Sequence, residues 1–396
     1  MLAFTAERLS TPAAAIEHPL LLVDDGRIVE MAAQNSRAVP SGASVVDFGN
    51  GIIAPGYIDL HIHGSAGYDV MDDDDEALPA IERLLARHGV TGYFPTTVSA
   101  PMDDTLRAVE RLADAVEQRD RDRNNRDHDN KNGERRAVPL GIHLEGPFIS
   151  HARRGVHPPQ DLLAPTLPLF EKLWQAAHGR IRMMTIAPEL EGAMEVIAEA
   201  ARRGVCVSLG HSDADFAVTE RAIDAGARHA THTFNAMRPL DHRNPGILGA
   251  VLTDQRVSAD IIADTVHIDP AIIKLFAMAK GPEQTVLITD AISATGMPNG
   301  RYHLGSFEVD VCDGKCTING RLAGSVLTLD RAVRNLARFA EWDMALAIGA
   351  ATRNPARVAK IANKGILASG ADADFIVLDP NGQVLRTFIG GVECFS

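Results

Sequence analysis

The sequence predicts an α/β protein built on a (β/α)8 TIM-type barrel, with a small β-sandwich domain formed from both chain ends. Three observations predict this. Through the middle of the chain, short apolar runs alternate with segments of helical periodicity. Both ends instead contain short strand-like runs separated by turns. Histidines and acids recur at the ends of the apolar runs, as expected where the strands of a barrel open into its mouth.

The middle of the chain contains eight strand-like runs. They are residues 57–63, 91–97, 138–145, 181–187, 204–210, 228–234, 257–263 and 285–290. Helical periodicity is clearest over Ala77–His88, Met102–Gln118, Glu191–Arg203, Phe216–Ala225, Ala271–Lys280 and Val326–Glu341. Several strands are apolar at nearly every position, which is typical of strands buried on both faces. A doubly wound open sheet is the alternative, but no GxGxxG turn opens any of these helices.

The two ends are predicted to form one β domain from residues 1–54 and 355–396, with the barrel over residues 55–354. Leu20–Val23 is followed by the turn Asp24-Asp25-Gly26 and a second strand-like run. The same texture returns near the C-terminus, where 374–378 and 384–389 flank the turn at 379–382. Neither end is long enough for a stable sheet by itself, so we expect the two to pair.

Residues 119–136 (RDRDRNNRDHDNKNGERR) interrupt the pattern. The segment is almost wholly charged or polar and has no apolar side chains to bury. We predict a solvated loop or a disordered insertion. It precedes the third strand, so it should emerge at the bottom of the barrel, away from the chemistry.

Composition narrows the class of protein. The 396 residues carry a formal net charge of -13, which argues against a nucleic-acid or anionic-membrane partner. No apolar run approaches the ~20 residues of a membrane span. Four cysteines are too few for a disulfide framework, and Cys312 and Cys316 flank what looks like a hairpin turn. We therefore expect a cytoplasmic protein.

His61 and His63 are two residues apart on the first predicted strand, so both side chains point to the same side. Two buried imidazoles are costly without partners. A hydrogen-bonded core pair is the structural alternative. Their position at the end of a first barrel strand, with other ligand types at other strand ends, favours a metal site.

Further ligand types end four later strands. Glu145 ends the third, His211 the fifth, His232 the sixth and Asp290 the eighth. One carboxylate with two imidazoles is a common set for a catalytic divalent ion with an open position. Glu145, His211 and His232 are therefore the candidate ligands of one ion, and His61 and His63 of a second. Asp290 is the candidate proton acceptor for an activated water.

These residues lie in strings that resemble the amidohydrolase superfamily, and within it the N-acetylglucosamine-6-phosphate deacetylases. The matching strings are Pro55-Gly56-Tyr57-Ile58-Asp59, His143-Leu144-Glu145-Gly146-Pro147-Phe148, Arg154-Gly155-Val156-His157, Gly210-His211-Ser212, Thr231-His232-Thr233-Phe234-Asn235-Ala236-Met237, Ala263-Asp264-Thr265-Val266-His267, Thr289-Asp290-Ala291 and Leu322-Ala323-Gly324-Ser325. They span most of the chain. The resemblance also implies the split β domain.

The resemblance further implies the substrate contacts. Asn235, the Ala236 backbone N–H and Arg243 would bind the sugar phosphate, with Arg243 reaching the neighbouring subunit of a homodimer. Val156, His157 and His267 would contact the sugar. Leu322, Ala323 and Gly324 would contact the acetyl end. A guanidinium suits a phosphate and explains how an acidic protein can bind an anion.

The expected reaction is removal of the acetyl group from N-acetyl-D-glucosamine 6-phosphate, in amino-sugar catabolism, with one or two divalent ions. Zn is the first choice, and Fe, Mn and Co remain open because imidazole and carboxylate ligands suit them all. His157, or alternatively His143, would stabilise the developing oxyanion. Alternatives are the N-acetylgalactosamine epimer, a cyclic-amide or N-acyl-D-amino-acid hydrolase, and a non-catalytic scaffold.

Overall fold

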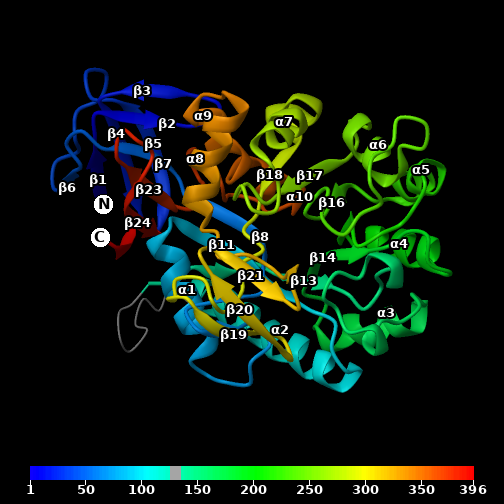
Figure 1. The fold of residues 1–396 in the computed structure, drawn as a ribbon. Coiled ribbons are helices and arrows are strands. Elements are labelled where there is room, and N and C mark those ends of the chain that lie inside the picture. Colours follow the sequence, from blue (N-terminus) through cyan, green and yellow to red (C-terminus); the bar gives the residue numbers. More distant parts are fainter. Residues whose placement is uncertain (125–134) are drawn as a thin grey trace.

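A barrel of parallel strands forms the centre of the molecule in the computed structural model, which describes residues 1–124 and 135–396 (Figure 1). Its strands are β8 (Tyr57–Ile62), β11 (Val90–Thr97), β13 (Ile142–Glu145), β14 (Ile181–Ile186), β15 (Cys206–Leu209), β16 (His229–Ala230), β17 (Ser258–Ile261) and β18 (Thr285–Leu287). The short β12 (Val138–Pro139) also pairs with β11. The barrel closes where Ile62 bridges Ala291, with the Asp290 N–H donating to the His61 carbonyl at 2.9 Å. The predicted barrel is confirmed.

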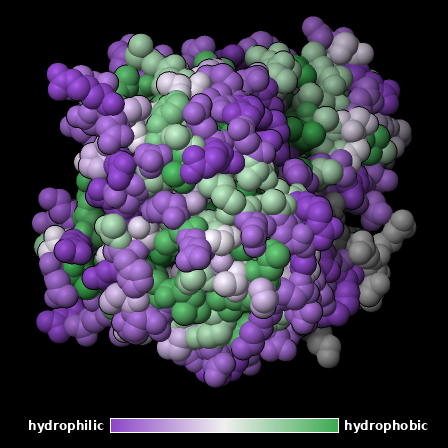
Figure 2. All heavy atoms as spheres, turned by 90° about the vertical axis from the view of Figure 1, so that its right-hand side faces the viewer, coloured by the Kyte–Doolittle hydropathy of each residue, from purple (hydrophilic) through white to green (hydrophobic). Residues whose placement is uncertain are grey.

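Helices follow the strands and cover the barrel (Figure 1). They are α1 (Ala77–Arg87), α2 (Met102–Asn124), α3 (Leu167–Ala176), α4 (Ala193–Arg202), α5 (Phe216–Ala225), α6 (Gly246–Thr253), α7 (Pro270–Gln284) and α8 (Leu329–Ala340), with the short α9 (Met344–Ala350) and α10 (Arg353–Val358) after them. The face in Figure 2 is hydrophilic over most of its area, with smaller apolar groups. Within the described ranges, no helix combines the length and apolar character needed to cross a membrane.

The sequence pattern did not indicate α3 or α6. In α6 every residue from Gly246 to Leu252 is buried, so the segment has no polar face and no helical periodicity to detect. In α3 a proline lies in the first turn, and the amphipathic stretch is only ten residues long. Short or fully buried helices give little periodic signal in the sequence.

Both chain ends join in a sandwich of two sheets beside the barrel, as predicted (Figure 1). One sheet has the order β5-β4-β1-β6, from Arg27–Ala33, Pro19–Asp24, Leu2–Thr5 and Ser44–Asp47. The other has the order β25-β24-β23-β7-β2-β3, from Val392–Phe395, Val384–Ile389, Phe375–Leu378, Ile52–Pro55, Arg8–Ser10 and Ala15–Glu17. Phe4 packs edge-on against Phe375, which stacks on Phe388 with ring centroids 4.5 Å apart. The division at residues 54/55 and 354/355 stays a prediction.

A further small sheet that the sequence did not indicate lies between β18 and α8. Its strands are β19 (Gly300–Leu304), β20 (Phe307–Cys312), β21 (Lys315–Ile318) and β22 (Arg321–Leu322). The hairpin expected at Cys312 and Cys316 is part of it, because Cys312 pairs with Lys315. Asp69, in the two-stranded hairpin of β9 (Gly64–Ser65) and β10 (Tyr68–Asp69), accepts the Gly305 N–H at 2.8 Å. The small sheet is therefore attached to the barrel's mouth.

The start of the charged segment 119–136 differs from the solvated loop that we predicted. Helix α2 continues to Asn124. The Arg119 guanidinium lies 2.7 Å from the buried Glu82 carboxylate, and Arg136 lies 3.5 Å from the same group. A buried carboxylate needs such partners, which draws both ends of the segment onto the protein. Residues 125–134, the rest of this prediction, lie outside the described residues.

Candidate active site

The predicted ligand residues converge at the carboxyl ends of the barrel strands. His61 lies on β8 with His63 just after it, Glu145 ends β13, and His211, His232 and Asp290 follow β15, β16 and β18. The last three have positive φ angles of 47°, 30° and 51°. Non-glycine residues rarely adopt this conformation unless the surrounding structure imposes it. At these three positions it changes the direction of the backbone just after the strand.

Glu145 lies between two pairs of imidazoles. Its Oε1 is 3.0 Å from His232 Nε2 and 3.3 Å from His211 Nε2. Its Oε2 is 3.2 Å from His63 Nε2 and 3.4 Å from His61 Nε2. Each oxygen of one carboxylate thus faces a different pair, and this places the two candidate ion sites next to each other.

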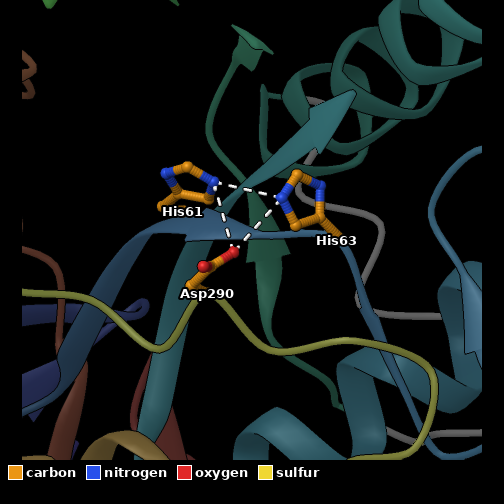
Figure 3. A group of neighbouring side chains, drawn as sticks. All are labelled: His61, His63 and Asp290. Carbon is orange, nitrogen blue, oxygen red and sulfur yellow. Dashed lines mark hydrogen bonds and ion pairs between the residues drawn. The ribbon is translucent and has the colours of Figure 1, made fainter. Parts of the chain in front are cut away.

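Asp290 completes the second group. Its Oδ1 lies 3.3 Å from His63 Nε2 and 3.6 Å from His61 Nε2, and the two imidazole nitrogens are 3.2 Å apart (Figure 3). His61, His63 and Asp290 point their polar atoms toward a common centre (Figure 3). The aspartate therefore lies within reach of both histidines, which also lie near the Glu145 carboxylate.

The chemistry of these nitrogens fits a cation. His63 Nδ1 donates to the Thr96 carbonyl at 2.9 Å, and His211 Nδ1 donates to the Arg153 carbonyl at 3.0 Å. In a neutral imidazole the other nitrogen, Nε2, then carries a lone pair. The Nε2 atoms of His211 and His232 are only 3.1 Å apart. Two lone pairs at that distance repel each other unless a proton or a metal ion lies between them, so the donor set fits a divalent metal ion.

The pKa values of the same groups indicate strong attraction for positive charge. Burial opposes ionisation of Glu145, but the nearby His61 and hydrogen bonds from other histidines hold its pKa well below the usual range. Burial also opposes ionisation of Asp290, but the hydrogen bond from His63 outweighs it and lowers the pKa of Asp290 to about 2. Burial lowers the pKa of His232, but Glu145 outweighs it and raises the pKa to about 9. The carboxylates stay ionised, and the site favours cations.

His157 lies at the same mouth in a different role. Its Nδ1 accepts from the Ser99 N–H at 3.2 Å and the Ser99 hydroxyl at 2.9 Å. Burial lowers the pKa of His157 to about 4, so the ring is neutral. The proton is then on Nε2, which lies 3.7 Å from Glu145 Oε2. His157 therefore presents an N–H donor to the mouth.

His143 has neither nitrogen available, which argues against our alternative that it stabilises an oxyanion. Its Nδ1 donates to the Leu60 carbonyl at 3.0 Å, and its Nε2 accepts from the Thr185 hydroxyl at 2.8 Å. Thr185 in turn lies 2.8 Å from Thr231 Oγ1. Burial holds the pKa of His143 well below its usual value. The imidazole belongs to a buried hydrogen-bonded layer beneath the candidate ligands.

Sequence reasoning missed this layer, along with Asp59. The Asp59 carboxylate accepts from the Thr289 hydroxyl at 2.6 Å and so holds the residue that precedes Asp290. His229 Nε2 lies 2.9 Å from the Asp260 carboxylate. The only available signal was the presence of polar residues within otherwise apolar strands, which does not identify their partners.

The candidate substrate residues divide into two groups by position. Leu322, Ala323 and Gly324 lie beside the turn that follows β18, where the Ser325 N–H donates to the Asp290 carbonyl at 2.7 Å. A Cβ on Gly324 would lie 2.3 Å from the Ile292 side chain, so this approach requires glycine. Val156 packs against the core of the small sheet, which includes Ile292 and Ala323.

The remaining candidates lie in loops after β16 and β17. The Asn235 side chain donates to the His232 carbonyl at 3.3 Å, and Ala236 has a positive φ of 51°. His267 lies 2.7 Å from the Asp264 carboxylate. Arg243 is exposed in the loop before α6, and its guanidinium has no ion pair with any described residue. This chain does not bring Arg243 to the ligand cluster.

The family model for the amidohydrolase family matches residues 52–394. The chain belongs to the amidohydrolase family. It is 36% identical over 369 residues to N-acetylglucosamine-6-phosphate deacetylase of Lysinibacillus sphaericus, covering 93% of this chain and 91% of that protein. The human enzyme of the same name is 38% identical, covering 87% of this chain and 84% of its own. N-acetylgalactosamine-6-phosphate deacetylase of Escherichia coli O157:H7 is 36% identical, with 98% and 97% covered.

Solved structures of deacetylases with the same name also resemble this chain. A variant of N-acetyl-D-glucosamine-6-phosphate deacetylase from Mycobacterium smegmatis, in complex with N-acetyl-D-glucosamine-6-phosphate, superimposes with a TM-score of 0.91 at 34% identity. That comparison covers 100% of this chain and 99% of the other. An enamidase with a TM-score of 0.61 at 14% identity shares the fold. The resemblance seen in the sequence strings is thus confirmed.

Proposed function

We propose that this amidohydrolase removes the acetyl group from N-acetyl-D-glucosamine 6-phosphate, yielding glucosamine 6-phosphate and acetate. The observation that carries the proposal is Glu145, placed between two imidazole pairs with Asp290 beside one of them. These residue types and their spacing support a hydrolytic metal centre. The deacetylases that match 93% and 87% of this chain supply the substrate class.

Glu145, His211 and His232 would hold one divalent ion, and His61 and His63 would hold a second. When bound, such an ion polarises the amide carbonyl and makes water more acidic. Zn is our first choice, with Fe, Mn and Co as alternatives for the same ligand types. Metal analysis of the purified protein separates these choices.

Asp290 would carry the proton. Its lowered pKa keeps it ionised at neutral pH, so it can take a proton from the attacking water. Its position next to Leu322–Gly324, the proposed acetyl contact, would let it return the proton to the leaving nitrogen. The His157 N–H would stabilise the developing oxyanion, since it is a neutral donor aimed into the mouth.

Phosphate recognition would use Asn235, the Ala236 N–H and Arg243, and sugar recognition would use Val156, His157 and His267. We infer a homodimer in which Arg243 reaches the partner's site, because the guanidinium is exposed and directed to no described group in its own chain. Exposed apolar side chains at Leu240 and along α7, at Leu275 and Met278, support a protein-protein contact on this chain. A cytoplasmic location remains a prediction.

The second candidate is the galactosamine epimer, which a curated relative with nearly complete coverage supports. The decisive experiment measures acetate release from both N-acetylhexosamine 6-phosphates and from both unphosphorylated sugars. We expect the glucosamine 6-phosphate derivative to have the highest kcat/KM and the 6-phosphate to raise it strongly. Equal rates with and without phosphate would overturn the proposal in favour of a cyclic-amide or N-acyl-D-amino-acid hydrolase.

A further inference from the structure

Behind His211 lies a group of charged side chains that the proposed reaction does not use. Asp213 Oδ1 is 2.7 Å from Arg153 Nε, and Asp213 Oδ2 is 3.1 Å from Arg238 Nη2. One carboxylate thus binds two guanidinium groups, one with each oxygen. The arginines come from different loops: Arg153 precedes His157, and Arg238 follows Asn235 and Ala236.

Backbone hydrogen bonds place these loops side by side at the same point. The Ser150 N–H donates to the His211 carbonyl at 2.9 Å. The Ser212 N–H donates to the Ala236 carbonyl at 3.0 Å, and the Arg238 N–H donates to the Ser212 carbonyl at 2.9 Å. Residues 211–213 therefore form the middle of three adjoining segments, and Asp213 is the residue whose side chain spans them.

The third constraint on this segment comes from Glu189, after β14. Its Oε1 accepts the Asp213 N–H at 2.6 Å, and its Oε2 accepts the Ser212 hydroxyl at 2.7 Å. The backbone of Asp213 is thus held independently of its side chain. Neutralising the Asp213 carboxylate should release the two arginines while leaving the segment after His211 in place.

We propose that Asp213 is a positioning residue that fastens the phosphate-binding loop, residues 235–238, to the loop that carries His157. Through Arg238 it sets the position of Asn235 and the Ala236 N–H. The Arg153 backbone, whose carbonyl accepts from His211 Nδ1, is held separately, because its N–H donates to the Ser150 carbonyl at 3.1 Å. Its effect falls on affinity for the 6-phosphate. The inference rests on the proposed function, because it assigns the phosphate to residues 235–236.

The test compares the holoenzyme with its Asp213→Asn and Asp224→Asn variants. Asp224 is a matched control, since it pairs with Arg256 at 2.8 Å on the exposed surface. For D213N we expect KM for the sugar phosphate to rise at least fivefold, with kcat within about twofold of wild type. Metal content and kcat/KM for the unphosphorylated sugar should not change, and D224N should match wild type throughout.

Direct binding of glucosamine 6-phosphate, measured by calorimetry, provides a readout independent of turnover. Weaker binding by D213N supports the inference even if wild type releases no acetate, an outcome that would refute only the proposed activity. Unchanged binding, or an equal loss on phosphorylated and unphosphorylated sugars, overturns it. If D213N does not fold, Arg238→Gln breaks the half of the contact that holds residues 235–238 and must shift the same ratio in the same direction.

Discussion

Two buried glutamates of this protein have the same exposure but different kinds of partner. Glu145 at the barrel's mouth and Glu82 on α1 are each 2% exposed. The partners of Glu145 are imidazoles, and those of Glu82 are Arg119, Arg136 and the Tyr93 hydroxyl. Burial of a carboxylate therefore does not identify a functional site.

The chemistry of the partners explains the difference. A guanidinium keeps its proton at all relevant pH values and supplies its own positive charge. A neutral imidazole offers a lone pair and leaves a charge to be supplied by a bound cation. Burial raises the pKa of Glu82 despite its arginines, whereas the histidines hold the pKa of Glu145 well below normal. Glu82 lies in a cluster whose charges are already paired, whereas Glu145 is the candidate ligand of an ion.

The largest expected effect is the loss of turnover when Asp290, at the mouth of the barrel, is replaced. Asp290→Asn removes the proton acceptor but keeps the shape of the side chain, so kcat should fall on the order of 10³-fold. Bound metal and thermal stability should stay near wild type. Steady-state acetate release with elemental analysis measures this, and near-normal turnover would remove Asp290 from the mechanism.

The second largest effect is on the affinity for a divalent ion, which should distinguish the two glutamates. Glu145→Gln should weaken divalent-ion binding by more than about 100-fold, beyond what loss of an outer partner of a ligand causes. Glu82→Gln serves as the matched control and should bind metal as wild type does. Competition with a chelator measures both, and equal metal affinity in the two variants would contradict our comparison.

The free energy of unfolding should fall in the Glu82→Gln variant, although its metal binding should not change. Glu82→Gln leaves two arginines without a carboxylate, which we expect to cost about 2 kcal/mol of unfolding free energy. Its kcat should remain within about twofold of wild type, because the cluster is far from the chemistry. Denaturant unfolding measures the loss, and a variant as stable as wild type would show that the arginines find other partners.

The smallest effect concerns the layer beneath the ligands. Thr185→Val removes the hydroxyl that donates to His143 Nε2 and should cost about 1 kcal/mol of stability. We expect a severalfold decrease in kcat as well, since His143 holds the Leu60 carbonyl next to His61. Measuring both in one variant distinguishes this layer from the Glu82 cluster, where only stability should change.

Much of the fold was predictable because the buried parallel strands are nearly continuous apolar runs. The predicted runs at 57–63, 181–187 and 285–290 contain β8, β14 and β18, respectively. Helix α6 was not predictable, since its uniform burial removes the periodicity. The sheet over 300–322 was not predictable beyond its hairpin, because its strands are short and half exposed.

The sequence by itself determined which strand ends carry ligand types, because strand alternation and strand order follow from local patterns. It also determined the family, through strings such as 143–148 and 231–237. Tertiary structure alone decided how Glu145 divides its oxygens between two histidine pairs, which nitrogen of His157 carries the proton, and that Asp213 joins two loops. These depend on partners distant in sequence, whose contacts exist only once the barrel has closed.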